Sequence, residues 1–410
     1  MADVAVTEPL VLVLRYADVG IATYASLRIV GQPERTVTWV VDEPSLLAAL
    51  DELAAALPEP NVTETVSDSL GRALTEGPFT APDRELLLAY RLGVLLIAPP
   101  GWDLLLDCVT SPRAVLFVAP SARLGSVPWS LLAKPAMFPA VAEMLAARTE
   151  AVTTEGPRAA QIPWPKAELE QLTEGYRLME LLDVLMAVPA NIAAMRRPAA
   201  PVTNGEQLLV LDPRIPGQRP DSALGSVLGR PSADTLLARH YAALMERRSV
   251  LPAVDTVVDL FRRTDADRDW LGAMLARRPA RMVYVGHASA AEGGHAERAA
   301  LHLCEHRPLT AGDLMASDLV FPPRVALLAC ASAGDYRFDE ATGLVAAVVL
   351  AGAELVTATL WSLPTSAGYR RFAGGDGDPM GDAIVAVDTA HQADTVLDAG
   401  DRKASCRERV

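Results

Sequence analysis

Five short runs of almost wholly apolar residues, each ending in small or turn-forming residues, most limit what this chain can fold into. They are AVLFVAP (114–120), QLLVLDP (207–213), RMVYVGH (281–287), RVALLAC (324–330) and ELVTATLW (354–361). Strands covered on both faces lack the alternation of apolar and polar residues, and parallel neighbours need long crossover connections. The runs therefore predict an α/β fold with a mostly parallel central sheet between two helical layers.

The segments between and after these runs have helical spacing. Apolar residues recur with a period near 3.6 over 234–248 and 255–278, which predicts helices there. The long apolar stretch 343–361 is interrupted by Gly352 and Glu354, which favours a buried helix, a tight turn and a buried strand over a membrane span. A last helix is expected over 382–397.

The first part of the chain has a different pattern. The segments 12–30 and 36–41 have the β-branched, partly alternating character of strands, and 45–57 has helical spacing after Pro44. We therefore expect a small α+β lead-in region over 1–81 and the α/β domain over 82–400. The last ten residues, DRKASCRERV (401–410), are polar and charge-dense, look foreign to the fold, and could be an artefact of cloning or assembly.

Charge and cysteine usage limit the partners and the compartment. The chain has 37 basic and 51 acidic residues and a net charge of −14, whereas nucleic acids and anionic membranes favour clustered positive charge. We expect neither as a partner. The N-terminus lacks the pattern of a signal peptide, and the four cysteines form no C-x-x-C pair, which favours a reducing cytoplasm and free thiols.

His287 ends one apolar run and Cys330 ends the next. In open α/β sheets, ligands bind beyond the carboxyl ends of the strands. If the two strands are parallel neighbours, imidazole and thiol emerge side by side at that edge. A neighbouring histidine can take the thiol proton or lower the thiol pKa, so the pair fits a cysteine nucleophile and its general base.

Acyl transfer also needs hydrogen-bond donors for the developing oxyanion. The backbone N–H groups of Cys330 and of Ala288, the residue after His287, are the candidates. Small residues surround both positions, in GHASA and CASAG, and leave room for a substrate backbone. The alternative is structural, because a lone cysteine that ends an apolar strand is more often a small buried hydrophobe.

Other chemistries fit the sequence less well. His287, His295, His302, Cys304 and His306 lie close together, but their spacing matches no common structural zinc pattern, and we expect no metal. The chain has no G-x-S-x-G elbow, which argues against a serine hydrolase. It also has no Walker A motif and no G-x-G-x-x-G fingerprint, and we expect no cofactor.

The order of several segments resembles the CHAT domain, a bacterial and eukaryotic relative of caspases and separase. The segments are LFVAPSARLGSVPWSLL (116–132), VYVGHASA (283–290), RPLTAGDL (307–314), VALLACASAG (325–334) and AGAELVTATLWSLPTSAGYRRF (351–372). The resemblance covers about 82–394. It implies a caspase-hemoglobinase fold and cysteine endopeptidase activity, with His287 and Cys330 as the dyad acting through a thioester acyl-enzyme.

The chain departs from the family pattern at three points. Ala288 stands where many relatives have glycine, SLPTS follows Trp361 where relatives commonly place an acidic residue, and the caspase Q-A-C-x-G signature is absent. Aspartate specificity is therefore not assumed.

The loop after Cys330 offers a substrate pocket. Asp335, Asp339 and Glu340 could accept a basic P1 side chain, which the separase-like analogy favours, and Arg337 could instead accept an acidic one. Each of these residues could equally be a solvated loop charge.

The resemblance also implies regulation. We expect a protein substrate and an activating or sensory partner protein, in bacterial signalling or defence. The competing hypothesis is a catalytically silent CHAT-like module that binds a partner protein.

Overall fold

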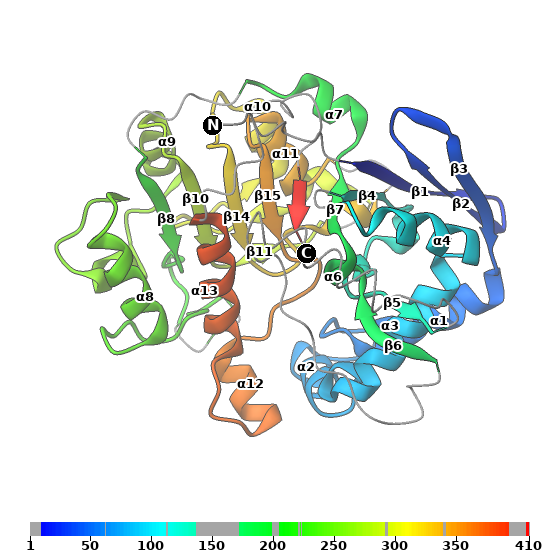
Figure 1. The fold of residues 1–410 in the computed structure, drawn as a ribbon. Coiled ribbons are helices and arrows are strands. Elements are labelled where there is room, and N and C mark those ends of the chain that lie inside the picture. Colours follow the sequence, from blue (N-terminus) through cyan, green and yellow to red (C-terminus); the bar gives the residue numbers. More distant parts are fainter. Residues whose placement is uncertain are drawn as a thin grey trace, which may run out of the picture. The chain divides into compact units, whose positions relative to one another are not determined.

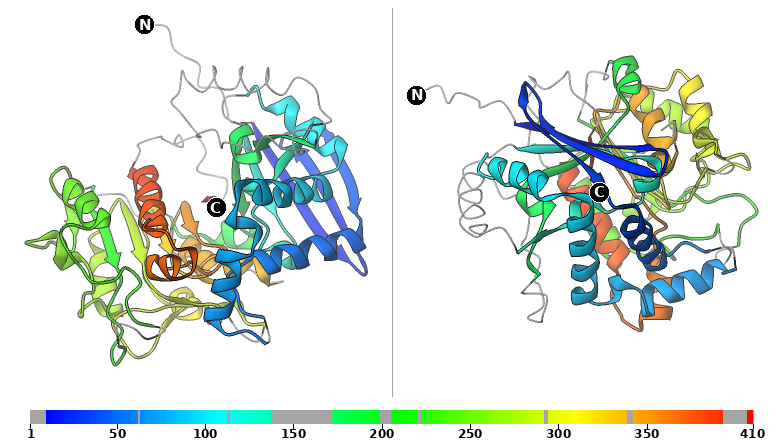
Figure 2. Two further views of the ribbon diagram at one scale, coloured as in Figure 1. Left: turned by 90° about the horizontal axis from the view of Figure 1, so that it is seen from below. Right: turned by 90° about the vertical axis from the view of Figure 1, so that its right-hand side faces the viewer.

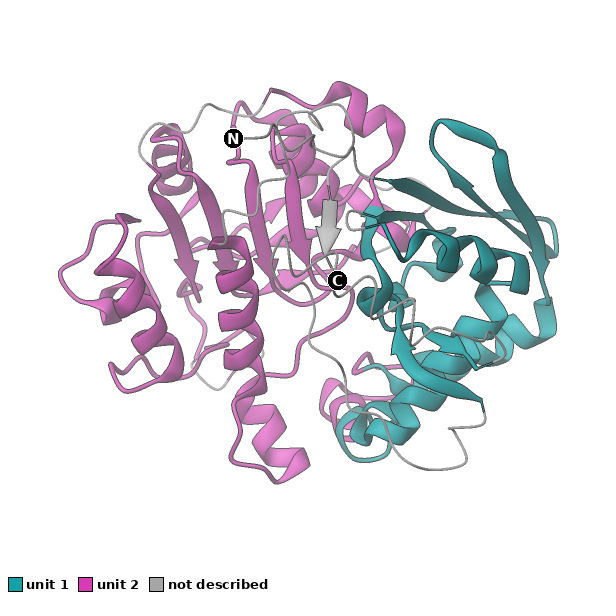
Figure 3. Ribbon diagram, in the orientation of Figure 1, with its two compact units in different colours: residues 1–57, 72–186, 410 teal, residues 58–71, 187–409 magenta. Residues whose placement is uncertain are grey.

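The computed structural model describes residues 10–61, 63–111, 114–136, 172–198, 205–219, 222, 224–291, 294–338, 342–392 and 407–409. The chain forms two compact units (Figure 3). Unit 1 comprises residues 1–57, 72–186 and 410, and unit 2 comprises residues 58–71 and 187–409. The domain boundary that the sequence pattern indicates at 81/82 stays a prediction.

Unit 1 contains a mixed sheet. Strands β1 (Val11–Val19), β2 (Ala22–Ile29) and β3 (Gln32–Val41) form an antiparallel meander, drawn in blue in Figures 1 and 2. The inner strand β1 pairs in parallel with β4 (Val115–Ala119), which pairs in parallel with β7 (Asp183–Ala187). The predicted N-terminal strands are confirmed, and they share one sheet with the first strand of the predicted α/β domain.

Short helices and a hairpin complete unit 1. The helices are α1 (Glu43–Ala56), α3 (Pro82–Leu96), α4 (Pro99–Cys108) and α6 (Leu178–Leu181). The hairpin pairs β5 (Ala133–Pro135) with β6 (Thr173–Arg177). Helix α2 (Val66–Thr75) belongs to unit 2 up to Gly71 and to unit 1 from Arg72. Helix α1 confirms the helix predicted over 45–57. Its N-cap Asp42 accepts a hydrogen bond from the backbone N–H of Ser45, which starts the helix two residues early.

Unit 2 contains the parallel sheet that the apolar runs predict. Its strands are β8 (Gln207–Leu211), β9 (Val250–Leu251), β10 (Arg281–Val285), β14 (Arg324–Leu328) and β15 (Leu355–Ala358). They lie in the order β9-β8-β10-β14-β15, and all pairs are parallel. The four long runs that fall in this unit are therefore strands at the predicted positions.

Helices cover both faces of this sheet. Successive side chains of a strand point to opposite faces, so each strand packs against helices on both sides. In β10, Met282 and Tyr284 pack in one apolar core, whereas Val283 and Val285 pack in another. The first core includes residues of α7 (Ala190–Met195), α9 (Arg268–Ala276), α10 (Ala311–Ala316) and α11 (Leu344–Leu350); the second includes residues of α8 (Leu236–Met245) and α13 (Pro379–Gln392). Figure 1 shows α13 across the near face.

Three further elements flank the edge at which β10 and β14 end. They are the short antiparallel strands β11 (Ala288–Ser289), β12 (Ala300–Leu301) and β13 (Leu309–Thr310). Helix α12 (Ser366–Ala373) follows β15. The expected helix, tight turn and strand over 343–361 are confirmed as α11, a turn at Gly352 with φ +115°, and β15.

The helix predicted over 255–278 is wrong in its first half. Only a 3-10 turn (Val257–Leu260) forms there, and α9 begins at Arg268. The Asp259 carboxylate accepts from the backbone N–H of Thr256 and caps the start of this short turn. Arg262 then has a φ of +53°, and its N–H donates to the carbonyl of Leu211 at the end of β8, which ends the turn. Asp267 then caps the new start by accepting from the N–H of Trp270.

The end of the chain is described only in part. The last helix, α13, ends at Gln392, and residues 393–397 of the predicted helix lie outside the described residues. Of the tail over 401–410, strand β16 (Arg407–Arg409) is described and pairs in parallel with β15.

Candidate active site

The register of β10 and β14 relates His287 to Cys330. The two strands are parallel neighbours, with Val285 opposite Leu328. The N–H of Gly286 donates to the carbonyl of Leu328 at 3.4 Å, so the pairing continues one residue further. His287 and Cys330 each stand two residues beyond their strand. The topology therefore brings both to equivalent positions at one edge of the sheet.

The His287 imidazole is half-buried and has a defined partner. Its Nε2 lies 3.0 Å from the carbonyl oxygen of Gly225. A carbonyl oxygen can only accept, so Nε2 must carry a proton, and in the neutral imidazole the lone pair is then on Nδ1. The ring is in the tautomer that leaves one nitrogen able to accept a proton.

Tyr284 holds the backbone of His287. The phenol is fully buried, and its oxygen lies 2.7 Å from the carbonyl oxygen of His287 and 2.8 Å from that of His302. One hydroxyl proton can serve only one of these carbonyls at a time. Gly286 must be small here, because a Cβ at this position would lie 2.8 Å from the Tyr284 oxygen.

The Cys330 thiol is half-buried, and its Sγ lies 4.0 Å from the carbonyl oxygen of Leu363. Burial raises the pKa of the thiol, and the negative charge of Glu59 adds to this effect. The thiol is therefore largely neutral near pH 7 and needs a base. Among the described residues, no hydrogen bond joins Sγ to the His287 ring.

The turn that follows Cys330 is tied to the loop after β15. Ala331 adopts the left-handed conformation with a φ of +48°, which is unfavourable for a residue with a side chain. Its N–H donates to the carbonyl of Trp361 at 2.9 Å, and the N–H of Ala333 donates to Thr359 at the same distance. These contacts hold the thiol at the edge of the sheet.

The hairpin pairing bears on the oxyanion donor expected at Ala288. Ala288 stands opposite Leu301, and the N–H of His302 donates to the carbonyl of His287 at 3.0 Å. Ala288 and Leu301 are thus the non-hydrogen-bonded pair of the ladder, and the N–H of Ala288 points away from β12. This orientation agrees with a donor role beside the backbone N–H of Cys330.

Two of the residues expected to line a substrate pocket are instead bonded to other parts of the protein. Asp335 is buried, and its carboxylate accepts from the N–H groups of Val345 and Ala346 at the start of α11, at 3.4 and 3.0 Å. Arg337 makes two contacts to the Glu59 carboxylate, at 2.9 and 2.8 Å. Both placements argue against a role in substrate recognition. Asp339 and Glu340 lie outside the described residues.

The histidines and the cysteine that suggest zinc lie apart in their contacts. His302 is buried with its Nε2 2.6 Å from Oγ of Ser289, and Sγ of Cys304 donates to the carbonyl of Thr264 at 2.8 Å. Within the described ranges, no group of three or more His, Cys, Asp or Glu side chains could hold a metal ion. Within the same ranges, no helix has the length and apolar character that crossing a membrane requires.

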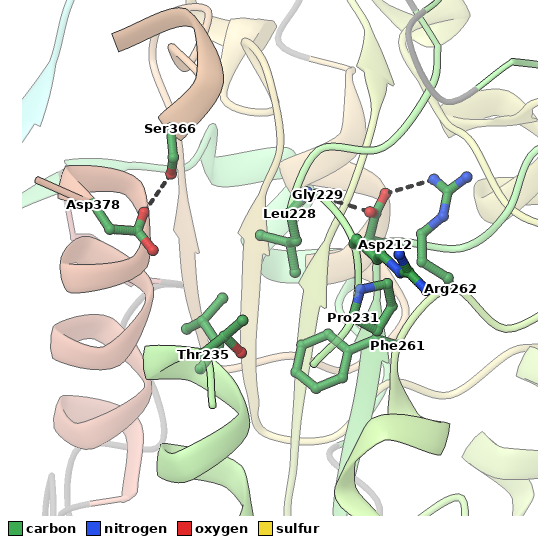
Figure 4. A pocket seen from close by; sticks show the side chains of 11 residues that line it. Asp212, Leu228, Gly229, Pro231, Thr235, Phe261, Arg262, Ser366 and Asp378 are labelled. Atoms are coloured by element: carbon green, nitrogen blue, oxygen red, sulfur yellow. Dashed lines mark hydrogen bonds and ion pairs between the residues drawn. The ribbon is translucent and has the colours of Figure 1, made fainter. Parts of the chain in front are cut away.

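Sequence reasoning missed the groups that surround the Gly225 carbonyl. Asp212 directly follows β8, the neighbour of β10, and its buried carboxylate lies 3.3 Å from Nη1 of Arg262, which also donates to Gly225 at 3.0 Å. Both side chains line a small pocket with Phe261 and Asp378 (Figure 4). The signal was present, because Asp212 is the first charged residue after the apolar residues of the run over 207–213, which precedes the run that ends at His287.

A comparison with family models decides the affiliation of the chain. The model of the CHAT domain matches residues 87–373, most of the chain. This chain belongs to the CHAT domain family. The resemblance inferred from the segment order is confirmed, and the match covers both His287 and Cys330. The CHAT domain family is related to the caspase-like peptidases, which is compatible with a peptidase role and with the observed α/β fold. A search of curated proteins finds no match.

Proposed function

We propose that this CHAT protein is a cysteine endopeptidase with Cys330 as nucleophile and His287 as general base. The observation that carries the proposal is the β10–β14 register, which brings the two residues to equivalent positions at the edge where parallel strands end. The fixed tautomer of His287 supports it, because the lone pair on Nδ1 can accept the thiol proton.

The reaction follows from these groups. The Cys330 proton passes to Nδ1 of His287 while Sγ bonds to the scissile carbonyl carbon, and the oxyanion accepts from the N–H groups of Ala288 and Cys330. The carbon–nitrogen bond then breaks, and the imidazolium gives its proton to the leaving amine. Water attacks the resulting thioester, its proton passes through His287, and the thiol is released with the carboxylic product.

The base is necessary here because burial raises the pKa of the Cys330 thiol. A substrate that fills the edge and moves Sγ from Leu363 towards the imidazole would complete the dyad. Such a movement of Sγ could be controlled by an activating partner protein. We propose a bacterial, cytoplasmic role in signalling or defence. A preference for a basic P1 side chain now depends on Asp339 and Glu340.

A second candidate function is a catalytically silent CHAT module that binds a partner protein. It is favoured by the thiol contact, since Sγ lies at Leu363 and no hydrogen bond to His287 is present among the described residues. In this case the pair would remain unassembled whatever partner is added.

Labelling with a cysteine-directed acyloxymethyl ketone separates the two functions. We expect the probe to label wild-type protein at Cys330, either alone or in a mixture with the products of neighbouring genes. Cys330→Ala and His287→Ala should lose the label. Cys304→Ala is the matched control, because this thiol is also free and partly exposed but lies outside the dyad. Absence of label in every mixture, from folded protein, would favour the silent module.

A panel of fluorogenic peptides tests the P1 proposal. We expect cleavage after arginine or lysine. Turnover of aspartate substrates alone would exclude a basic preference.

A further inference from the structure

A buried carboxylate at the end of β8 organises the loop that faces His287. Asp212 is fully buried, and its carboxylate accepts from the N–H of Val227 at 3.1 Å and from Oγ of Ser226 at 2.7 Å. It also accepts from the N–H of Leu228 at 3.3 Å. Several donors from one loop thus converge on one carboxylate, which shapes the segment that begins at Gly225.

Arg262 connects this carboxylate to the histidine partner. Its Nη1 lies 3.3 Å from Oδ1 of Asp212 and 3.0 Å from the Gly225 carbonyl oxygen, and its side chain is largely buried. The same carbonyl accepts from Nε2 of His287 at 3.0 Å. The contacts therefore run without a break from Asp212 through Arg262 and Gly225 to the imidazole.

Backbone strain marks the first two residues of this chain of contacts. Asp212 has a φ of +51° and Arg262 a φ of +53°, a region that non-glycine residues rarely adopt. Backbone hydrogen bonds hold each of them, from Asp212 to Val285 at 2.6 Å and from Arg262 to Leu211 at 3.1 Å. Such strain persists where the surrounding structure over-determines it, and it is concentrated at functional sites.

The charges are also complementary. A guanidinium and an imidazole share one carbonyl, so an imidazolium formed during catalysis would be repelled by Arg262 alone. The Asp212 carboxylate, buried against the guanidinium, offsets that charge. A neutral group at position 212 would leave a buried, unpaired cation beside the ring.

We propose that Asp212 and Arg262 are positioning residues that fix the Gly225 carbonyl and hold His287 as the Nε2–H tautomer. The role of that tautomer in taking the Cys330 proton depends on the proposed peptidase function, whereas the tautomer itself does not. The pair acts through the loop and contacts neither thiol nor substrate.

Nitrogen-15 NMR of the full chain labelled at histidine tests the tautomer directly, with His287→Ala used to assign the signals. We expect wild-type His287 to show one neutral form protonated at Nε2. Asp212→Asn and Arg262→Met should show a mixture of tautomers, and Arg262→Lys should retain more of the native form. Asp265→Asn is the matched control, since it removes an exposed carboxylate that also pairs with an arginine, Arg263.

Kinetics with the ketone probe and with peptides give the second readout. We expect Asp212→Asn to lower kcat by about 10- to 100-fold with little change in KM, because Asp212 orients the histidine through hydrogen bonds and does not bind the peptide. If a variant fails to fold, Ser226→Ala, which removes a single donor to Asp212, should give a smaller change in the same direction.

The outcomes are distinct. An unchanged His287 tautomer in folded Asp212→Asn and Arg262→Met would overturn the inference. A changed tautomer in a protein that reacts with no probe would support the positioning role and reject the peptidase function.

Discussion

The polar residues at the two ends of strands β8, β10 and β14 differ in how they are paired and buried. At the amino ends, Arg281 lies opposite Gln207 and Arg324, and its guanidinium contacts the Asp388 carboxylate of α13 at 2.5 Å. At the carboxyl ends stand Asp212, His287 and Cys330, of which the last two are half-buried. One end anchors a helix, and the other leaves a thiol and an imidazole accessible.

Charges are paired at the anchoring end, and several hydrogen bonds converge on the Asp388 carboxylate. Besides Arg281, the Asp388 carboxylate accepts from His240 at 2.6 Å and from Gln392 at 2.5 Å. Burial alone would raise the pKa of Asp388, but the hydrogen bond from His240 and the charge of Arg281 outweigh it and lower that pKa. The contrast teaches that paired buried charges stabilise the fold at one end, whereas the thiol and the imidazole at the other end are not hydrogen-bonded to each other and remain available for the proposed chemistry.

The largest expected difference between the two ends is in stability. Asp388→Ala should lower the free energy of unfolding by roughly 3–5 kcal/mol, because it leaves the Arg281 guanidinium buried and unpaired. Cys330→Ala should change it by less than about 1 kcal/mol, as substitutions of partly exposed residues usually do. Urea unfolding followed by tryptophan fluorescence measures both.

A double variant controls this comparison. Arg281→Met with Asp388→Leu should recover most of the lost stability, since no charge is then left unpaired. Equal stability of Asp388→Ala and Cys330→Ala would show that the amino ends are not the anchor.

The second difference concerns space at the carboxyl end. Gly286→Ala would place a methyl group against the buried Tyr284 oxygen, and we expect a loss of roughly 1–3 kcal/mol, as for other overpacked sites. The shift of the His287 backbone should also slow reaction with the ketone probe. Thermal unfolding and labelling rates test both effects.

Gly272→Ala is the matched control. It lies inside α9, where the nearest atom to an added Cβ is 3.4 Å away, so it should be tolerated or add up to about 1 kcal/mol of helix stability. A tolerated Gly286→Ala would mean that Tyr284 can move.

The third difference is in pH dependence. Burial raises the pKa of Asp335 to about 6, although the α11 N–H groups oppose the shift. A carboxyl with a raised folded pKa contributes stability below its unfolded pKa and loses it as pH rises through the folded value. Asp388 behaves in the opposite sense, because its pKa is lowered and its contribution is lost in acid.

Asp335→Asn isolates this effect. From about pH 4 to pH 7, wild-type protein should lose roughly 2–3 kcal/mol relative to the variant, which cannot ionise there. Unfolding free energies at several pH values give the difference. A constant difference across that range would contradict the raised pKa.

The smallest expected effect is at the turn after Cys330. Ala331→Gly should relieve the positive φ and change stability by less than about 1 kcal/mol, since the gain opposes the greater chain entropy of glycine. Differential scanning calorimetry detects such a change. A large loss of stability would show that the Ala331 methyl group packs in a way that φ does not reveal.

Much of unit 2 could be predicted from the chain alone. Strands buried on both faces are apolar at every position, so β8, β10, β14 and β15 stand out wherever the apolar run is short and bounded. The positions of His287 and Cys330 at the strand ends follow from the same runs. The helix predicted over 255–278 is wrong in its first half because the backbone N–H of Arg262 bonds to the distant carbonyl of Leu211, a contact that the apolar period does not reveal. Asp267 then caps a new helix start.

The role of single polar residues was decided by the tertiary structure. Asp335 follows Cys330 closely in sequence, yet its carboxylate accepts from the N–H groups at the start of α11, because the chain folds back over that helix. Asp212 and Gly225 lie far from His287 in sequence. The β8–β10 pairing brings Asp212 to the same edge of the sheet, and the Gly225 carbonyl, which Arg262 links to Asp212, accepts directly from the His287 ring.

The sequence by itself determined the α/β class, the parallel strands and the edge where a thiol and an imidazole emerge, because hydrophobic burial leaves a local, periodic pattern. Tertiary structure alone decided the tautomer of His287, the contact of Cys330 with Leu363, and the joining of the N-terminal strands to β4. These depend on hydrogen bonds between distant segments, which are directional and leave no period in the chain.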